Sequence, residues 1–500
     1  MLKEMRSERT PGAPDAMSEQ ADASKIVRTL SLLIRLPGLS GMLSSIEDCG
    51  TCGINHIELG VDEYLGREHP NRCLKGRMVS KFVSETIKKG VASFGIEEDQ
   101  VRGALKDPYT RRGLMSVIKG LGKFGMKEPF TPGAPFLVVW NLTNSCNLKC
   151  AHCYQNAKNA LADELTTEEK LKVVDELDKE GVVAIAFSGG EPLMARDFFT
   201  VAEHAYRKGM AVSVATNGTL VTPQVAERMK DCGVCYVDVS LDGASSDVHD
   251  AFRGIPGLYE KTIQGIRNLV SAGIDTCIAT TAVSTNYPQI PKIIDIAKEL
   301  GVKRFMMFNF IPSGRGATMT DRDISPMQRE ELLKYLYNTT QSTNVTALCT
   351  APQFSRVSLQ MSHESGKNLV SPTHFAAIPM PGKLAELSRF IGGCGAGRMY
   401  CAIQPNGAVT PCVFMPTLVL GNLRQRPFGE IWASNGILTD LRDRTRLKGA
   451  CKNCEYRSVC GGCRARAYGY YGDLLASDPG CVLIGQELKE PSMEAIYSTI

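Results

Sequence analysis

Three cysteines that lie close together constrain this chain more than any other feature of its sequence. Cys146, Cys150 and Cys153 have the spacing Cys-x3-Cys-x2-Cys and follow an apolar segment, residues 135–143, that has the composition of a buried strand. Three such thiolates can each bind one iron of a cubane 4Fe–4S cluster and leave the fourth iron without a protein ligand. That iron can bind a small molecule and transfer one electron to it. The same thiols could instead bind zinc, so the triplet alone leaves both kinds of site open.

A second group of cysteines lies in the C-terminal part of the chain. It contains two Cys-x2-Cys pairs, a spacing found among both zinc ligands and iron–sulfur ligands. The group comprises Cys394, Cys401, Cys412, Cys451, Cys454, Cys460, Cys463 and Cys481. Eight cysteines suffice for two complete four-ligand sites. A zinc ribbon is the alternative, but a redox triplet upstream gives electron-transfer clusters a purpose.

Composition indicates a protein that uses its cysteines for chemistry. The chain has 18 cysteines in 500 residues, and in a reducing compartment thiols bind metals or catalyse reactions rather than form disulfides. Residues 1–22 are polar and contain Pro11 and Pro14, so no secretory signal is expected. No apolar stretch is long enough to span a bilayer. We therefore expect a cytoplasmic protein without a transmembrane segment.

Charge and size limit the partners and the number of domains. With 57 basic and 53 acidic residues the net charge is only +4, which argues against a nucleic-acid partner.

A hydrophobic content of 43% suffices for two or three domains, and helical periodicity at 81–92 and 112–124 suggests a helical N-terminal region. We expect a disordered tail at 1–22, a helical N-terminal accessory domain at 23–131, a barrel at 132–320, a connecting region at 321–389, a cysteine-rich domain at 390–485 and a C-terminal tail at 486–500.

From Pro132 onward, apolar runs alternate with helical patterns. Continuous apolar runs are typical of parallel strands that are buried on both faces. The expected strands are 135–143, 182–188, 211–216, 235–241, 276–283 and 304–311. Thr166 and Glu169 are placed as a helix capping box after the first strand. Six βα units predict an α/β fold, a partial (β/α)6 barrel of the TIM type with its site at the C-terminal ends of the strands.

Short polar motifs follow successive strands, where such a barrel places its site. The run Gly-Gly-Glu-Pro at 189–192 follows the second strand, Asn217 follows the third, and Ser240 and Asp242 follow the fourth, with Arg253 beyond them. Glycines allow close approach to a ligand, and a carbonyl and a carboxylate there can accept hydrogen bonds from an ammonium group. Together with the cysteine triplet, these motifs resemble those of the radical S-adenosylmethionine (SAM) superfamily.

That resemblance implies a role for each motif. By resemblance, Gly189, Gly190 and Glu191 would bind the SAM amino group, Asn217 and Arg253 its carboxylate, and Ser240 and Asp242 its ribose, with His152 packed against the cofactor. Cys146, Cys150 and Cys153 would hold the cluster whose open iron binds SAM.

The C-terminal cysteines resemble the SPASM domain, which carries two auxiliary 4Fe–4S clusters and would bring the total to three. In that family the ligands interleave. By resemblance one cluster would be bound by Cys394, Cys401, Cys412 and Cys463, and the other by Cys451, Cys454, Cys460 and Cys481. With four ligands each, neither cluster would have an open iron, which favours electron transfer over direct binding of substrate.

The implied activity is reductive cleavage of SAM to a 5′-deoxyadenosyl radical, which removes a hydrogen atom from the substrate. A peptide or protein substrate, as in maturases, is the expected one, with oxidative decarboxylation of a tetrapyrrole as the alternative. Ferredoxin or flavodoxin would supply the electron. Arg315, in a Gly-Arg-Gly turn after the sixth strand, is a candidate contact for a substrate carboxylate. A zinc-stapled interaction scaffold is the non-enzymatic alternative.

A third set of cysteines lies in the N-terminal region, on glycine-rich loops. Cys49 and Cys52 form a Cys-x2-Cys pair and Cys73 follows, so a further metal could bind there. His56 is close enough in sequence to be a fourth ligand, although a single histidine often has only a structural role.

Overall fold

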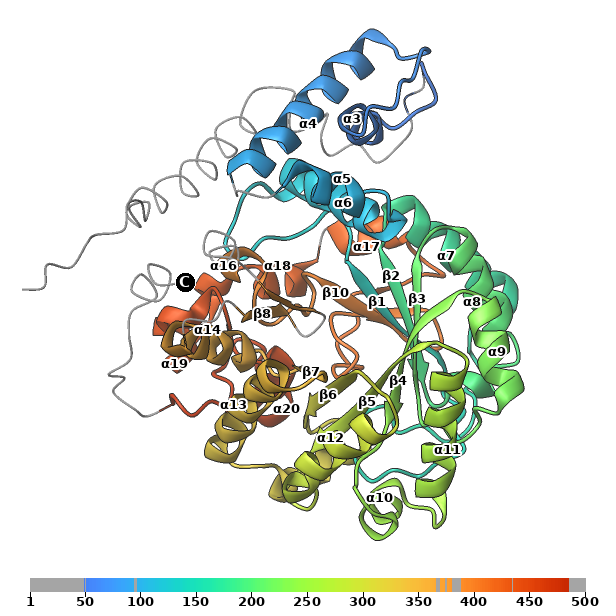
Figure 1. Ribbon diagram of the computed structural model, residues 1–500, viewed down its shortest axis with the longest axis vertical. Coiled ribbons are helices and arrows are strands. Elements are labelled where there is room, and N and C mark those ends of the chain that lie inside the picture. Colours follow the sequence, from blue (N-terminus) through green and yellow to red (C-terminus); the bar gives the residue numbers. More distant parts are fainter. Residues whose placement is uncertain are drawn as a thin grey trace, which may run out of the picture.

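The computed structural model describes residues 49, 51–93, 97–365, 369–373, 376–379, 388–433 and 435–484 (Figure 1). The two tails expected at 1–22 and 486–500 lie outside the described residues.

A ten-stranded sheet forms the centre of the molecule, in the order β12-β11-β10-β1-β2-β3-β4-β5-β6-β7. Six of its strands confirm the six predicted from apolar runs: β1 (Leu137–Thr143), β2 (Ala184–Gly189), β3 (Ala211–Thr216), β4 (Val234–Ser240), β5 (Asp275–Ala282) and β6 (Arg304–Asn309). These six pair in parallel, each with the next along the chain. Parallel pairing requires a crossover between strands, and helices make it.

The crossover helices cover the outer face of the sheet (Figure 1). They are α7 (Thr167–Glu180), α8 (Phe198–Arg207), α9 (Pro223–Asp231), α10 (Ser246–Arg253), α11 (Leu258–Ser271) and α12 (Ile290–Glu299). The predicted capping box is present, since the Thr166 hydroxyl accepts from the Glu169 amide and the Glu169 carboxylate accepts from the Thr166 amide. A large apolar core, including Trp140, Phe187 and Phe198, fills the space between sheet and helices.

The sheet extends beyond the six predicted strands at both ends. β7 (Thr346–Cys349) adds a seventh parallel strand from the region expected to be a connection, together with α13 (Pro326–Ser342) and α14 (Gln353–Ser365). β10 (Tyr400–Ile403) pairs in parallel with β1, and β11 (Ala408–Thr410) and β12 (Gly421–Asn422) follow in antiparallel order. The cysteine-rich region therefore shares one sheet with the barrel and covers an edge of β1 that would otherwise be unpaired.

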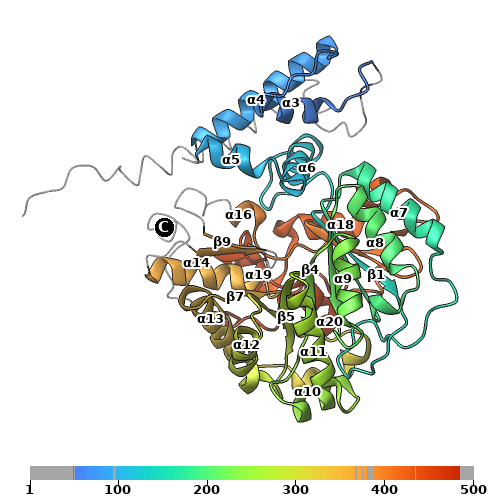
Figure 2. The same cartoon turned by 45° about the vertical axis from the view of Figure 1, so that its right-hand side comes forward.

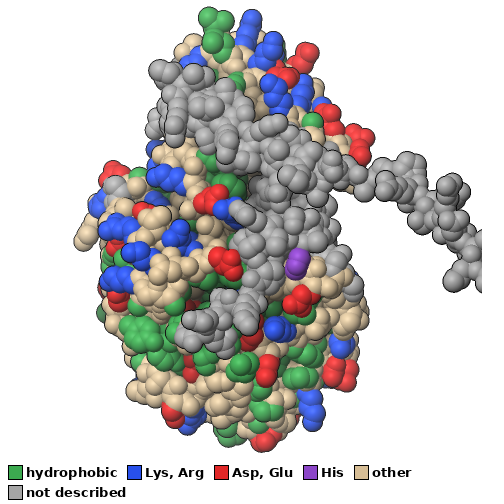
Figure 3. Space-filling view, turned by 90° about the vertical axis from the view of Figure 1, so that its left-hand side faces the viewer, with side chains coloured by type: hydrophobic (Ala, Val, Ile, Leu, Met, Phe, Trp, Pro, Cys, Tyr) green, Lys and Arg blue, Asp and Glu red, His purple; other side chains and the backbone are tan. Residues whose placement is uncertain are grey.

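The remaining elements of the C-terminal part are short. They are the hairpin β8 (Leu369–Thr373) and β9 (Ala376–Pro379), and the helices α16 (Ser388–Ile391), α17 (Phe428–Ala433), α18 (Gly436–Arg442), α19 (Gly449–Asn453) and α20 (Arg464–Tyr471). No helix in the described part of the chain is both long enough and apolar enough to cross a membrane. Lys and Arg side chains are interspersed with Asp and Glu on the face shown in Figure 3, as the small net charge predicts.

The N-terminal region is helical, as predicted. It consists of α3 (His56–Tyr64), α4 (Leu74–Ser93), α5 (Glu98–Ala104) and α6 (Pro108–Phe124). α6 lies next to the barrel, and α3 and α4 lie farther from it (Figure 2). Arg112 of α6 donates to the Asp178 carboxylate at 2.9 Å and to the carbonyl oxygens of Val182 and Lys208. α6 is therefore attached to the barrel itself.

Candidate active site

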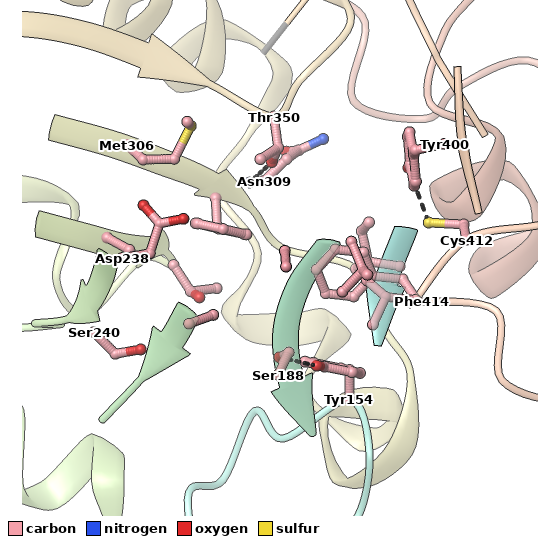
Figure 4. A pocket seen from close by; sticks show the side chains of 18 of the residues that line it. Tyr154, Ser188, Asp238, Ser240, Met306, Asn309, Thr350, Tyr400, Cys412 and Phe414 are labelled. Atoms are coloured by element: carbon pink, nitrogen blue, oxygen red, sulfur yellow. Dashed lines mark hydrogen bonds between the residues drawn. The ribbon is translucent and has the colours of Figure 1, made fainter. Parts of the chain in front are cut away.

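A cavity of about 690 Å³ lies on the inner side of the sheet and extends from the first residues of the strands to their C-terminal ends. Its wall is built from the loop after β1, residues of β1 to β6, and the cysteine-rich region. Figure 4 shows Asp238, Ser240 and Met306 on one side of it and Tyr400, Cys412 and Phe414 on the other. The cavity is the place in which the predicted motifs converge.

All three cysteines of the first triplet line this cavity. Cys146, Cys150 and Cys153 pack with Leu148 and Leu258 in one apolar cluster. Burial raises the pKa of the Cys146 thiol to about 12, so the thiol stays protonated unless a cation stabilises the thiolate. Thiols that converge on a cavity in this way fit an iron–sulfur cluster, which supplies the required positive charge.

Arg315 lines the cavity but uses its guanidinium on the cysteine loop. Its Nε donates to the Cys150 carbonyl oxygen at 2.9 Å, and Nη1 donates to the Ala157 carbonyl oxygen at 2.9 Å. The Arg315 backbone amide also donates to the carbonyl oxygen of Cys153 at 2.9 Å. None of these partners is a carboxylate, so the positive charge beside the cavity is not neutralised by them.

The glycines after β2 allow this turn to lie directly against the cysteine loop. The Gly190 and Glu191 amides donate to the carbonyl oxygens of Thr143 and Ser145, both at 2.8 Å. A Cβ on Gly190 would lie 2.1 Å from the Ser145 carbonyl oxygen, and Gly189 has a φ of 127°. Only glycine fits at both positions. Both glycines line the cavity, so a ligand there can come close to their backbone.

Glu191 lies behind the cavity wall, because its carboxylate is buried and used within the protein. It accepts from the Thr216 hydroxyl at 2.7 Å and from the Asn217 amide at 2.9 Å. Burial raises the pKa of this carboxyl. Glu191 thus ties the turn after β2 to the turn after β3, where Asn217 does line the cavity and donates to Asn147 of the cysteine loop.

Ser240 and Arg253 line the cavity, whereas Asp242 is fully buried beside it. The Arg253 guanidinium donates to the Asp242 carboxylate through Nε at 2.6 Å, and Nη1 lies 3.7 Å from the Cys150 sulfur. Burial acts to raise the pKa of Asp242, but Arg253, His152, His249 and the Thr281 amide together hold that pKa below its usual value. The pair places a fixed positive charge next to the cysteine loop.

His152 is a neutral side chain at the cavity wall. Its ring stacks on Phe252 with centroids 4.1 Å apart and an interplanar angle of 7°. Burial lowers the pKa of His152 to about 3. Nδ1 has no hydrogen-bond partner, so a buried polar atom is available to a ligand at this wall.

The structure brings together three of the four cysteines that we assigned to the first auxiliary cluster. Cys394, Cys412 and Cys463 line the cavity and pack in one apolar cluster. Cys401 does not join them. In the register of β10 with β1, Cys401 pairs with Val138, and both lie in the core on the outer face of the sheet. Tyr400 pairs with Leu137, and both line the cavity. Neighbouring residues of a strand point to opposite faces, so Cys401 is directed away.

Cys401 therefore does not supply the fourth ligand of this group, and Tyr400, its neighbour in β10, lies beside Cys412 instead. The Tyr400 hydroxyl lies 3.1 Å from the Cys412 sulfur (Figure 4). Burial raises the pKa of the Cys412 thiol to about 12. Three converging thiols at the cavity wall, two of them buried, could each bind one iron of a cluster.

The four cysteines of the second auxiliary group, Cys451, Cys454, Cys460 and Cys481, lie near one another. The four thiols are close enough for Cys451, Cys454 and Cys481 to act electrostatically on Cys460, and burial raises the pKa of Cys460 well above its usual value. The Gly462 amide donates to the Cys460 sulfur at 3.3 Å, and Arg464 Nη2 lies 3.8 Å from the Cys451 sulfur. These donors favour bound thiolates, so the four cysteines fit a complete cluster site.

Sequence reasoning missed a polar group on the far side of the cavity. Asp238 of β4 accepts from the Tyr236 hydroxyl at 2.9 Å, and burial raises the pKa of Asp238 to about 6. Asn309 and Thr350 lie across from it (Figure 4). The sequence pattern Tyr236-x-Asp238-x-Ser240 could have indicated this group, since alternate residues of a strand share a face.

Comparison with known proteins agrees with this geometry. The profile described as "Radical SAM superfamily" matches residues 140–288, and that described as "Iron-sulfur cluster-binding domain" (SPASM) matches 394–455. An AdoMet-dependent heme synthase of Methanosarcina barkeri is 38% identical over 351 residues, which cover 70% of this chain and 97% of that protein. The mycofactocin maturase MftC of Mycolicibacterium smegmatis is 30% identical over 362 residues, which cover 71% of this chain and 85% of that protein.

Among solved structures, SuiB of Streptococcus suis bound to its precursor peptide SuiA has a similar fold. The TM-score is 0.59 at 16% identity, and the match covers 85% of this chain and 93% of that chain.

Proposed function

The chain belongs to the radical SAM superfamily and carries a SPASM domain, and on that premise we propose that it decarboxylates a carboxyethyl side chain of a tetrapyrrole. SAM and 4Fe–4S clusters are its cofactors. When bound, they supply a 5′-deoxyadenosyl radical that removes a substrate hydrogen atom. In the proposed reaction the substrate radical then releases CO2 and passes one electron to an iron–sulfur or flavin acceptor. The carboxyethyl side chain thereby becomes a vinyl group.

The apolar wall of the cavity carries this proposal. Leu137, Val139, Met306, Phe308 and Leu348 line it. A peptide backbone placed against such walls would leave N–H and C=O groups unpaired, at a cost of roughly 1–3 kcal/mol for each group. A tetrapyrrole is flat and largely apolar, and its polar groups are carboxylates on flexible arms. The similarity to a heme synthase, over nearly all of that protein, also supports this choice.

Charge at the cavity supports a carboxylate-bearing substrate. Arg253 is paired with Asp242, and Arg304 is paired with Asp275 at 2.9 Å. The Arg315 guanidinium donates to the carbonyl oxygens of Cys150 and Ala157 and to the side-chain oxygen of Asn156, all of them neutral groups. We propose that Arg315 attracts a substrate carboxylate while it holds the loop in place.

The test uses anaerobically reconstituted protein and iron coproporphyrin. Binding should shift the Soret band, and incubation with SAM and a reductant should yield product that has lost one formic acid equivalent per side chain, alongside 5′-deoxyadenosine. A variant with Cys146, Cys150 and Cys153 changed to Ala should still bind the porphyrin but form neither product. Absence of both binding and product in the wild type would rule out the tetrapyrrole.

Maturation of a peptide or protein side chain is the second candidate. The observation that favours it is the helical region before residue 131, which precedes the matched radical SAM profile and could dock a peptide. MftC, at 30% identity, supports it as well. In this case the porphyrin would not bind, and deletion of α3 to α5 would remove peptide modification while SAM cleavage continued.

A further inference from the structure

Four side chains outside the cavity meet where two N-terminal helices begin. Cys49 and Cys52 lie in the loop before α3, His56 is its first residue, and Cys73 directly precedes α4. Their ligand atoms all lie within 4.8 Å of one another. The site assigned to radical chemistry uses none of them.

The spacing of these atoms is that of a tetrahedron around one metal ion. The sulfurs of Cys49 and Cys73 are 3.8 Å apart, and His56 Nε2 lies 3.7 Å from the Cys52 sulfur and 3.5 Å from the Cys73 sulfur. With Zn–S near 2.3 Å and Zn–N near 2.1 Å, tetrahedral angles require S···S distances of about 3.8 Å and S···N distances of about 3.6 Å. The observed distances agree with these values.

Other uses of the four groups fit less well. A disulfide has a sulfur–sulfur distance of about 2.05 Å, far shorter than the separation of Cys49 and Cys73. A 4Fe–4S cluster places each thiolate on a different iron at the outside of a cube, so its ligand atoms cannot lie this close together. One tetrahedral ion remains, and zinc favours such a Cys3His set in structural sites.

The backbone around the site is arranged to support thiolates. The Gly76 amide donates to the Cys73 sulfur at 3.2 Å, and the amides of Thr51 and Cys52 hydrogen-bond to the Cys49 thiol. Gly53, with a φ of 68°, closes the turn between the cysteine pair and α3, and its amide donates to the Cys49 carbonyl oxygen at 2.7 Å. Three thiolates and Zn²⁺ carry a net charge of −1, which the N-terminal ends of α3 and α4 stabilise.

We propose that Cys49, Cys52, His56 and Cys73 bind one zinc ion in a closed structural site that holds α3 against α4. At the contact between the two helices, Gly60 lets α3 approach Val83 of α4 closely. Small units of this kind commonly need a metal to be stable, because metal binding contributes directly to their folding free energy.

The test measures zinc and iron together in the full-length protein, produced with zinc in the medium. Wild type should contain one zinc per chain, and X-ray absorption at the zinc edge should show three sulfurs at about 2.3 Å and one nitrogen at about 2.1 Å. His56→Cys should keep the zinc with four sulfurs. Cys73→Ser should lose most of the zinc with iron unchanged, while the control Cys235→Ser, an exposed cysteine apart from the site, should change neither.

A second measurement, amide hydrogen exchange, reports on the stability of α3 and α4. Removal of zinc by a chelator should speed amide exchange in 56–64 and 74–93 and leave β1 to β6 unchanged. The proposal is overturned if wild type lacks zinc, if iron occupies the site, if Cys49 and Cys73 are found as a disulfide, or if Cys73→Ser retains full zinc. The spectrum of the wild type decides the matter even if a variant does not fold.

Discussion

At the scale of single residues, the Arg253–Asp242 ion pair lies beside the cysteine triplet, with Arg253 Nη1 3.7 Å from the Cys150 sulfur. Both side chains are nearly inaccessible, with 10% and 0% exposure. Arg253→Met would leave the Asp242 carboxylate buried and unpaired, which costs about 3–5 kcal/mol. We expect a clear fall in the thermal midpoint of the reconstituted protein. Arg304→Met breaks a pair that is about 40% exposed on each side and should cost only about 0–1 kcal/mol. Equal shifts in the two variants would contradict this account.

Cys401 and Cys412 differ in the face of the sheet to which they point. Because Cys401 lies in the outer core and Cys412 at the cavity, Cys401→Ala should leave the iron content at the wild-type value. Cys412→Ala should lower it by up to four irons per chain, the content of one cubane. Iron and sulfide analysis after reconstitution distinguishes the two. An equal loss of iron in Cys401→Ala would show that Cys401 is a ligand after all.

Asp238 should make stability depend on pH. Burial raises the pKa of this carboxyl from its usual 3.8 to about 6 in the folded protein. Because the pKa is higher in the folded protein, protonation of Asp238 favours folding. This contribution to the free energy of unfolding is complete below pH 3.8 and is lost as pH rises through about 6. Asp238→Asn should therefore stabilise the protein more at pH 7.5 than at pH 5, by about 1 kcal/mol. Thermal midpoints at both pH values measure this, and the exposed control Asp295→Asn should show no such difference.

At the scale of elements, the turn after β2 is held against the loop after β1 without room for a side chain. Gly190→Ala would place a Cβ 2.1 Å from the Ser145 carbonyl oxygen, so the turn must move away from the cysteine loop. We expect SAM affinity, measured by equilibrium dialysis, to fall at least tenfold while the auxiliary iron remains. Gly113→Ala in α6, where an added Cβ meets nothing within 4 Å, serves as the control. Unchanged affinity in Gly190→Ala would show that the turn adjusts without cost.

At the scale of the whole molecule, the N-terminal region has two parts with different attachments. α6 contacts the barrel through Arg112, and Ser116 hydrogen-bonds to the Ala134 carbonyl oxygen at 2.9 Å. Deletion of residues 1–106 should therefore spare SAM cleavage. Deletion of 1–131 also removes α6 and uncovers the barrel, so it should lower the thermal midpoint and the yield of folded protein. If both truncations behaved alike, α6 would contribute nothing to the barrel.

The sequence by itself determined the features that depend on local pattern. The six strands and the capping box at Thr166 follow from apolar runs and turn residues, which act over a few positions. The Cys146 triplet and the glycines at 189 and 190 fall at the strand ends because a parallel βα unit puts every such end at one edge.

Tertiary structure alone decided which distant side chains meet. The pairing of β10 with β1 sets the register that turns Cys401 away from the cavity, and a shift of one residue would reverse it. Asp238 gains its raised pKa only from the protein packed around it. The approach of Cys73 to His56 depends on how α4 packs on α3. These contacts join residues far apart in sequence, and no local pattern encodes their distance.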